Sequence, residues 1–285
     1  MRTLPGSLVL ALALAGPAAF PVSAADAPAR EGVDVKKSSL LLLPKSTVEN
    51  SAGQQYAQLM RSAAQQGVLN VDRRQVERLR EIARKLIPPA ARFNADAQRW
   101  RWEVNLINAK TVNAFCMPGG KIAFYSGILG ALKLTDDEVA MIMGHEIAHA
   151  LLEHGRARMS EQVLKNVGVT VAAVLLNLGQ VSTSMLAQAT DLAISLPFSR
   201  QHETDADLVG MELAARAGYD PRAAANVWRK MSQLGAQSGN SQPPQILSTH
   251  PAHATRIKEI EANLPRVLPL YEAARETARK SGETR

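Results

Sequence analysis

Two histidines and a glutamate in the segment HEIAH have the spacing of a zinc site. His145 and His149 are four residues apart, so on a helix their imidazoles lie one above the other on the same face. Two imidazoles placed in this way can bind one tetrahedral zinc ion, with Glu146 beside them as a candidate general base. The apolar flanks disfavour the alternative, a pair of surface histidines. The motif therefore predicts one Zn²⁺ ion per chain.

A catalytic zinc site needs a third protein ligand, and the best candidates lie in the segment RQHETDAD. Glu203 and Asp207 are four residues apart and share one helical face. One carboxylate can bind zinc, and the other can accept the spare N–H of a ligating histidine and fix its tautomer. The alternative is an exposed acidic face, which is common on solvated helices.

Two other histidines lie near these motifs. His154 follows His149 by five residues, and the intervening residues include no glycine or other turn signal. We therefore expect His154 to be a polar residue at the helix end, near the cleft, and not a ligand. His202 points about 100° away from Glu203 around the helix and is not expected to bind metal either.

Two further residues are candidates for substrate binding or catalysis. His250 precedes Pro251 and follows a stretch rich in Gly, Ser, Gln and Pro. It could donate to the oxyanion of a tetrahedral intermediate, fill the fourth zinc position in a resting form, or simply mark a helix start. Asn113 lies on an extended stretch that could be an edge strand pairing with substrate backbone, or an interior strand of a small sheet.

The elements that must position these residues follow from hydrophobic spacing and capping signals. Thr135 and Glu138 form a capping box that begins the HEIAH helix, which continues to about residue 152. Gly144 costs about 1 kcal/mol inside a helix, so we expect another backbone to approach closely there. The predicted class is mainly α with a small β-sheet (α+β). Other helices are expected over 49–66, 72–87, 160–178, 199–217 and 253–263 and from 220 onward, and strands over 100–108, 112–117 and 121–125.

The ends of the chain and its composition limit the remaining possibilities. Arg2, an apolar run and small residues before Ala25 predict a signal peptide cut after residue 24, hence a periplasmic location. Apolar residues at 46% and charged residues at 21% exclude wholesale disorder, and a single cysteine excludes an intrachain disulfide. The net charge of +7 suggests at most peripheral membrane contact, and export argues against nucleic-acid partners.

The predicted domain plan has four parts. A signal peptide (1–24) is followed by a flexible N-terminal arm (25–48), a zinc metalloprotease domain (49–268) and a charged C-terminal tail (269–285). Within the protease domain, the segment 160–198 is expected to be a core helix, a lid over the cleft, or a membrane-contacting element. Its apolar run, from Val167 to Leu178, is too short to cross a bilayer.

Four motifs resemble, in order, those of a family of zinc metalloendopeptidases. They are NAFCMPGGKIAFYSGIL, HEIAHALLEHG, LPFSRQHETDADLVGMELAARAGYDP and STHPAHATRI. The family includes the CAAX prenyl endopeptidases, the HtpX membrane proteases and the periplasmic BepA-type proteases. The resemblance covers roughly residues 50–265 and implies a gluzincin-type domain. This chain is similar to a soluble, exported member without a helical-repeat domain.

The same resemblance implies a role for each candidate residue. Zinc would be bound by His145, His149 and Glu203. Glu146 would be the general base, and Asp207 would support a zinc histidine. By the same likeness Asn113 holds substrate backbone and His250 stabilises the oxyanion or caps the zinc, while Arg256, which follows the family's HP motif, is predicted on the substrate-binding side.

Two functions from different classes remain at this point. The first is hydrolysis of peptide bonds in unfolded or misassembled envelope proteins, with Glu146 activating the zinc water. The second is a periplasmic holdase or assembly factor whose zinc site is latent or structural, with all four positions filled by protein ligands.

Overall fold

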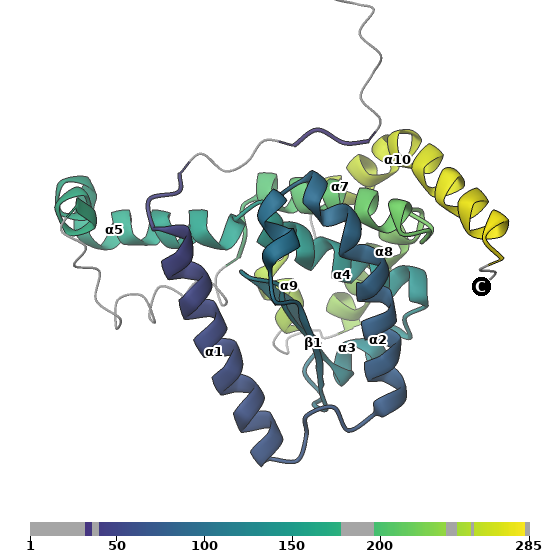
Figure 1. Ribbon diagram of the computed structural model, residues 1–285, viewed down its shortest axis with the longest axis horizontal. Helices are drawn as coiled ribbons and strands as arrows, with labels where there is room; N and C mark the ends of the chain where they lie inside the picture. Colours follow the sequence, from purple (N-terminus) through teal and green to yellow (C-terminus); the bar gives the residue numbers. More distant parts are fainter. Residues whose placement is uncertain (1–31, 36–39, 178–196, 238–243, 252–253, 283–285) are drawn as a thin grey trace, which may run out of the picture. The chain divides into compact units, whose positions relative to one another are not determined.

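The computed structural model describes residues 32–35, 40–177, 197–237, 244–251 and 254–282. Within these ranges most residues are helical and three short strands form one sheet (Figure 1), which confirms the α+β prediction. The predicted signal peptide and residues 178–196 of the predicted lid or core segment lie outside the described residues. The helices are α1 (Lys45–Gln65), α2 (Arg73–Leu86), α3 (Ser126–Leu132), α4 (Asp136–Leu151), α5 (His154–Asn177), α7 (Arg200–Arg216), α8 (Ala223–Gln237), α9 (Gln245–Thr249) and α10 (Ala254–Lys280), with 3₁₀ turns η1 (Pro88–Arg92) and η2 (Ala95–Arg99).

The sheet has the strand order β1-β3-β2, with β1 at Glu103–Ile107, β2 at Ala114–Met117 and β3 at Lys121–Tyr125. β2 and β3 form the antiparallel hairpin predicted from the sequence, and β1 runs parallel to β3. Because β3 is central, β2 is an edge strand, and among the described residues no strand pairs with its outer backbone groups.

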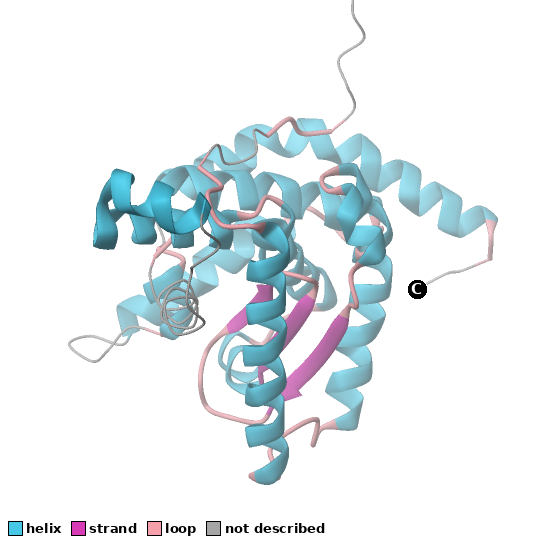
Figure 2. Ribbon diagram, turned by 60° about the vertical axis from the view of Figure 1, so that its left-hand side comes forward, coloured by secondary structure: helices cyan, strands magenta, loops and turns pink. Residues whose placement is uncertain are grey.

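The two faces of the sheet are covered by different helices. Tyr56 and Met60 of α1 pack with Met117 and Ala123 on one face, and Figure 2 shows α1 crossing in front of the strands. On the other face, Ile122 and Phe124 join the main core, and α2 and α4 pack there against β1 and β2. The alternation of side chains along each strand divides the apolar residues between these two layers.

Helix α4 begins with the capping box expected from the sequence. The Thr135 hydroxyl accepts the Glu138 N–H at 3.3 Å, and the Glu138 carboxylate accepts the Thr135 N–H at 2.8 Å. Two of the four N–H groups that a helix start leaves unpaired are thereby satisfied. The helix that carries HEIAH is therefore fixed at its first turn.

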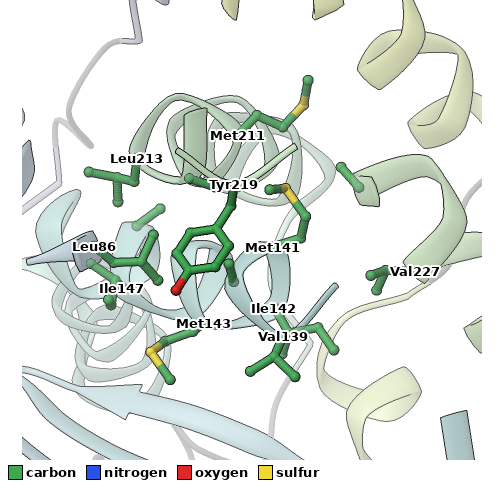
Figure 3. Packing of buried hydrophobic residues seen from close by; sticks show 14 of the residues in the cluster. Leu86, Val139, Met141, Ile142, Met143, Ile147, Met211, Leu213, Tyr219 and Val227 are labelled. Carbon is green, nitrogen blue, oxygen red and sulfur yellow. The ribbon is translucent and has the colours of Figure 1, made fainter. Parts of the chain in front are cut away.

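Helices α4 and α7 cross at a pair of glycines. A Cβ added to Gly144 would lie 2.8 Å from the carbonyl oxygen of Gly210, and one added to Gly210 would lie 2.7 Å from the nitrogen of His145. The close backbone approach expected at Gly144 is confirmed. Beyond the crossing, apolar side chains such as Met143, Ile147 and Tyr219 fill the space around the two helices (Figure 3).

The described N-terminal residues are packed, although the sequence predicts a flexible arm over 25–48. Val33 and Leu43 are buried, and the Val33 N–H donates to the Glu212 carboxylate at 2.6 Å. Glu212 is itself fully buried and pairs with Arg92 and Arg216. Gly32 has φ +102°, and a Cβ there would lie 2.2 Å from the Glu212 carboxylate, so glycine is required. These contacts hold the segment against α7.

The C-terminal helix is longer than predicted. The sequence predicts a helix over 253–263 followed by a frayed tail from 269, whereas α10 continues to Lys280. Val267 and Leu270 are buried in the main core, and this burial stabilises the extra turns despite Pro265 and Pro269.

The glycine crossing gives a first prediction. Gly144→Ala should destabilise the protein by about 1–3 kcal/mol and lower its zinc affinity, because the new methyl group meets backbone that cannot move aside. Gly53→Ala in α1, where nothing lies within 4 Å, is the matched control and should stabilise by about 0.5–1 kcal/mol. Urea unfolding with chelator and zinc titration measure the two effects. Equal stability of both variants would contradict the role given to the crossing.

Candidate metal centre

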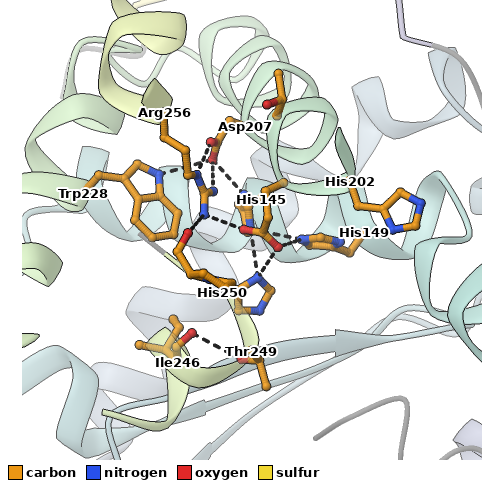
Figure 4. Close-up of polar contacts among 12 residues, drawn as sticks. His145, His149, His202, Asp207, Trp228, Ile246, Thr249, His250 and Arg256 are labelled. Atoms are coloured by element: carbon orange, nitrogen blue, oxygen red, sulfur yellow. Dashed lines mark hydrogen bonds and ion pairs between the residues drawn. The ribbon is translucent and has the colours of Figure 1, made fainter. Parts of the chain in front are cut away.

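Helix α4 turns both HEIAH histidines toward one point. The Nε2 atoms of His145 and His149 are 3.1 Å apart, and both side chains are buried. This convergence, visible in Figure 4, is the result of the i,i+4 spacing on one helix face. Two imidazole nitrogens that face each other this closely are arranged as ligands of a common ion.

Glu203 joins the histidines from the first turn of α7. Ser199 caps this helix by accepting the His202 N–H at 3.2 Å. The Glu203 carboxylate is fully buried, with one oxygen 3.4 Å from His149 Nε2 and the other 3.6 Å from His145 Nε2. The Gly144–Gly210 crossing is what allows α7 to bring this carboxylate so near to α4.

His250 completes a group of four possible donors. Its Nδ1 lies 3.3 Å from His145 Nε2 and 3.0 Å from a Glu203 oxygen. It follows α9, whose Ile246 N–H donates to the carbonyl of Val112 at 3.1 Å just before β2. Ligand atoms of His145, His149, Glu203 and His250 all lie within 4.8 Å of one another, and all four residues are buried. We call these four possible metal ligands the donor cluster.

The spacing of these donors fits zinc. Zn²⁺ with tetrahedral bonds of 2.0–2.1 Å separates its ligand atoms by about 3.3–3.4 Å. The separations of 3.1, 3.3 and 3.4 Å among His145, His149, His250 and Glu203 are close to that value. Nitrogen and carboxylate oxygen are also the donor types that zinc prefers in catalytic sites. The residues present can hold the ion with little movement.

Asp207 fixes the orientation of His145 from the second turn of α7. Its carboxylate accepts the Nδ1–H of His145 at 2.9 Å, which leaves the Nε2 lone pair facing the other donors. Trp228 of α8 donates its indole N–H to the same carboxylate oxygen at 3.2 Å. The structure thus brings Asp207 to the place that the resemblance implied.

Arg256 is buried beside the two carboxylates. Its guanidinium donates to both Asp207 oxygens at 2.7 and 2.8 Å and to Glu203, and it stacks on Trp228 with 3.4 Å between its Cζ and the ring centre. Only 2% of the residue is exposed. We therefore assign it the role of charge partner to the carboxylates, in place of the substrate contact expected from the sequence.

The charges around the site set its protonation states. Burial acts to raise the pKa of Glu203, but His250 and His149 outweigh it and hold that pKa well below its usual range. Burial also acts to raise the pKa of Asp207, but the Arg256 guanidinium outweighs it and holds that pKa below its usual value. Burial lowers the pKa of His149 well below the usual value, so its imidazole is neutral, as a metal ligand must be.

Glu146 differs from the other carboxylates. Burial raises its pKa, and the carboxylate oxygen Oε1 has no hydrogen-bond partner within the described part of the chain. That oxygen lies 3.5 Å from His250 Nε2, beside the donor cluster and not in it. A buried carboxylate of raised pKa with a free oxygen next to a metal site is suited to proton transfer.

Asn113 lies next to the edge strand that the sequence pointed to. It precedes β2 directly, is 6% exposed, and its side-chain oxygen is buried without a partner among the described residues. Its own carbonyl accepts the Tyr125 N–H at 3.1 Å, which fixes the backbone. Because this side-chain oxygen has no protein partner in the described ranges, a ligand could supply one.

Two side chains contact the His149 imidazole in ways that no sequence pattern indicated. His154 Nδ1 lies 2.9 Å from His149 Nδ1, and the Phe198 ring stacks on the His149 imidazole with 3.9 Å between centres. His154 was expected at the helix end with no turn before it. In the structure Glu153 has φ +57°, which ends α4 and turns His154 back toward the site. No glycine signalled that turn, and Phe198 sits in a loop without periodicity.

Together the sheet, the HEIAH helix, the second helix with its carboxylate and the buried donor cluster define a gluzincin-type zinc metalloprotease domain. A model of Peptidase family M48 matches residues 73–264, about two-thirds of the chain. The chain belongs to Peptidase family M48. This membership confirms the predictions of a metalloprotease and of zinc as its cofactor. It also confirms the predicted family, without selecting one group of its members.

Several curated proteins are similar to this chain. The mitochondrial metalloendopeptidase OMA1 of Arabidopsis thaliana is 39% identical over 157 residues, which are 55% of this chain and 30% of the relative. Its Schizosaccharomyces pombe counterpart is 37% identical over 166 residues, 58% of this chain and 47% of the relative. The beta-barrel assembly-enhancing protease of Yersinia pestis is 30% identical over 176 residues, 58% and 35% respectively. The match spans less than half of each relative.

The comparisons correct the predicted location. A periplasmic location was expected from the N-terminal residues, but similar proteins from plant, yeasts, cattle, zebrafish and human are named as mitochondrial. The periplasmic prediction is therefore wrong. Within the described residues, no helix is both long enough and apolar enough to cross a membrane.

The geometry of the centre predicts the effect of removing one ligand. Glu203→Ala should reduce zinc affinity by more than about 100-fold, because even outer partners of zinc ligands contribute 10–100-fold. Glu276→Ala on α10, an exposed carboxylate paired with Lys280, is the control and should bind zinc like the wild type. Metal analysis and chelator competition on the purified proteins measure this. Wild-type affinity in Glu203→Ala would remove Glu203 from the ligand set.

The buried arginine gives a prediction for stability. Arg256→Gln should destabilise the metal-free protein by about 3–5 kcal/mol at neutral pH, because two buried carboxylates lose their positive partner. Arg229→Gln, whose ion pair with Glu261 is about half exposed, should cost about 0–1 kcal/mol. Denaturant unfolding with chelator present measures both.

The sign of the pH dependence follows from the lowered pKa of Asp207. In the wild type this carboxylate stabilises the fold above its usual pKa of about 4, and that contribution is lost as the pH falls. In Arg256→Gln the carboxyl groups take up protons at higher pH. The gap in stability between the two proteins should therefore be widest near pH 7 and should narrow toward pH 4. A gap that stays constant over this range would contradict the charge role.

Proposed function

We propose that this chain is a zinc-dependent endopeptidase that hydrolyses peptide bonds in unfolded or misassembled proteins. The observation that carries the proposal is the donor cluster with the buried Glu146 carboxylate beside it, whose Oε1 accepts no hydrogen bond within the described residues. His145, His149 and Glu203 would hold the ion. Bound zinc supplies a Lewis acid and a water of pKa near 7.

Glu146 performs the proton transfers in this proposal. Its free oxygen can take a proton from the attacking water and then deliver it to the amine that leaves. Its raised pKa makes the carboxylate a stronger base for the first step, and a pKa nearer the working pH suits a group that must both take up and release a proton. Asp207 keeps His145 in the tautomer that presents Nε2, so this ligand needs no rearrangement between turnovers.

His250 has two roles in the proposed cycle. Its Nδ1 lies within reach of the same ion as the other three residues, so in a resting form the imidazole would cap the metal position. Substrate binding then requires His250 to leave that position. From beside it, its ring N–H can donate to the negative charge that develops on the scissile carbonyl oxygen.

The edge of the sheet supplies the substrate site in this proposal. A peptide in extended conformation can add to the outer edge of β2, while the Asn113 amide meets its backbone at the end nearer α9. Backbone pairing is tolerant of side-chain sequence, and it requires a segment that is not already folded. Unfolded or misassembled chains meet that requirement, and one similar protein is named for enhancing the assembly of β-barrels.

A structural zinc site in a binding protein is the second candidate. The observation that favours it is His250, because four protein donors leave no position for water. The buried Glu146 carboxylate, whose Oε1 accepts no hydrogen bond in the described part of the chain, favours catalysis, since a structural site has no use for it. The two candidates differ in what a substitution of Glu146 does.

Glu146→Gln tests this difference. The variant should bind zinc with an affinity near that of the wild type but cleave an unfolded protein such as casein at least about 100-fold more slowly, since general base catalysis contributes 10²–10⁴-fold. Glu276→Gln on the exposed face of α10 should cleave like the wild type. Product analysis on gels and zinc competition provide the two readouts. Cleavage by Glu146→Gln at the wild-type rate would overturn the proposed mechanism, and absence of cleavage by the wild type would favour the binding role.

A further inference from the structure

The second HEIAH histidine has a neutral partner where the first has a carboxylate. His154 is fully buried at the start of α5, and its Nδ1 lies 2.9 Å from Nδ1 of His149. A separation of 2.9 Å is that of a hydrogen bond, so one of the two nitrogens must carry the proton. The positions of the other donors decide which one.

The donor cluster determines the tautomer of His149. Its Nε2 faces His145 Nε2 at 3.1 Å and a Glu203 oxygen at 3.4 Å, so a metal ion held there needs the Nε2 lone pair. In a neutral imidazole the proton then sits on Nδ1, which donates to His154. His154 must accept through Nδ1 and carry its own proton on Nε2.

The cost of that arrangement is visible at the far side of His154. Its Nε2 is buried and has no hydrogen-bond partner in the described ranges. An apolar side chain would leave no such group unsatisfied, so stability alone does not favour histidine at this position. The hydrogen bond to His149 is the interaction for which a histidine is needed.

Stacked rings hold the two imidazoles in place. The His154 ring lies against His202 with centres 4.2 Å apart and planes 17° apart. On the other side, Phe198 stacks on His149, and the Arg158 guanidinium carbon lies 3.7 Å from the centre of the Phe198 ring. Neither imidazole can rotate freely, so packing fixes the geometry of the hydrogen bond between them.

We infer that His154 is a positioning residue for zinc: it accepts the Nδ1–H of His149 and so aims the His149 lone pair at the metal. It does for His149 what Asp207 does for His145, from a different helix and without a negative charge. The turn at Glu153, with φ +57°, is the backbone feature that brings it there. This inference rests on the proposed zinc site, and it adds a residue that touches neither metal nor substrate.

Two substitutions separate the hydrogen bond from the packing. His154→Phe keeps a flat ring against His202 but removes the acceptor, and it should raise the dissociation constant for zinc 10–100-fold. His154→Asn places an amide oxygen where Nδ1 was and should stay within about 3-fold of the wild type. Chelator competition with zinc measures all three proteins after circular dichroism has shown them folded. Equal affinity of folded His154→Phe and wild type would overturn the inference, as would an equal loss in both variants.

A measurement on the unsubstituted protein covers the case in which His154→Phe does not fold. In the zinc-loaded wild type labelled with ¹⁵N-histidine, NMR should show a proton on His149 Nδ1, a proton on His154 Nε2 and a scalar coupling between the two Nδ1 atoms. A proton on His154 Nδ1 or absence of the coupling would overturn the inference. A wild type that binds no zinc would overturn the proposed function as well, whereas normal zinc binding without the coupling removes only the role of His154.

Discussion

The contact between Gly144 and Gly210 is the constraint on which the metal centre depends. Its donors come from three segments separated by more than forty residues of chain, and zinc allows its ligand atoms only about 3.3 Å between them. At the crossing the backbones of α4 and α7 touch without side chains between them. Glu203 can therefore reach the two HEIAH histidines without strain, and the apolar residues around the crossing keep the helices from sliding.

The close approach of α4 and α7 buries two carboxylates near the metal centre, and a guanidinium group from a later helix balances their negative charge. Glu203 and Asp207 lie on consecutive turns of α7, and Arg256 from α10 bonds to both. An ion pair of this kind is buried at considerable cost and does little for stability relative to an apolar core. Its value lies in the site, where it keeps both carboxylates ionised and oriented whether or not a metal is bound.

Local signals in the sequence were sufficient for part of this architecture. The capping box and the i,i+4 histidines depend on neighbours within one turn, and the structure matches them. Gly144 indicated a close backbone approach, but its partner Gly210 lies on another helix. The contact of His154 with His149 could not be read from the sequence, because Glu153 adopts a left-handed conformation that is rare outside glycine and asparagine. The burial of Arg256 was also hidden, since it depends on how α10 packs against α7 and α8. The length of α10 could not be predicted for the same reason, because burial of Val267 and Leu270 in the main core extends this helix.

The link between Val33 and Glu212 has a practical consequence for making this protein. Glu212 keeps two guanidinium groups and one main-chain N–H around it, and the N–H belongs to a residue far upstream. A recombinant chain that starts after Val33 would leave the carboxylate one donor short in the interior. Expression boundaries are therefore best drawn ahead of Gly32, with any affinity tag joined upstream of that glycine.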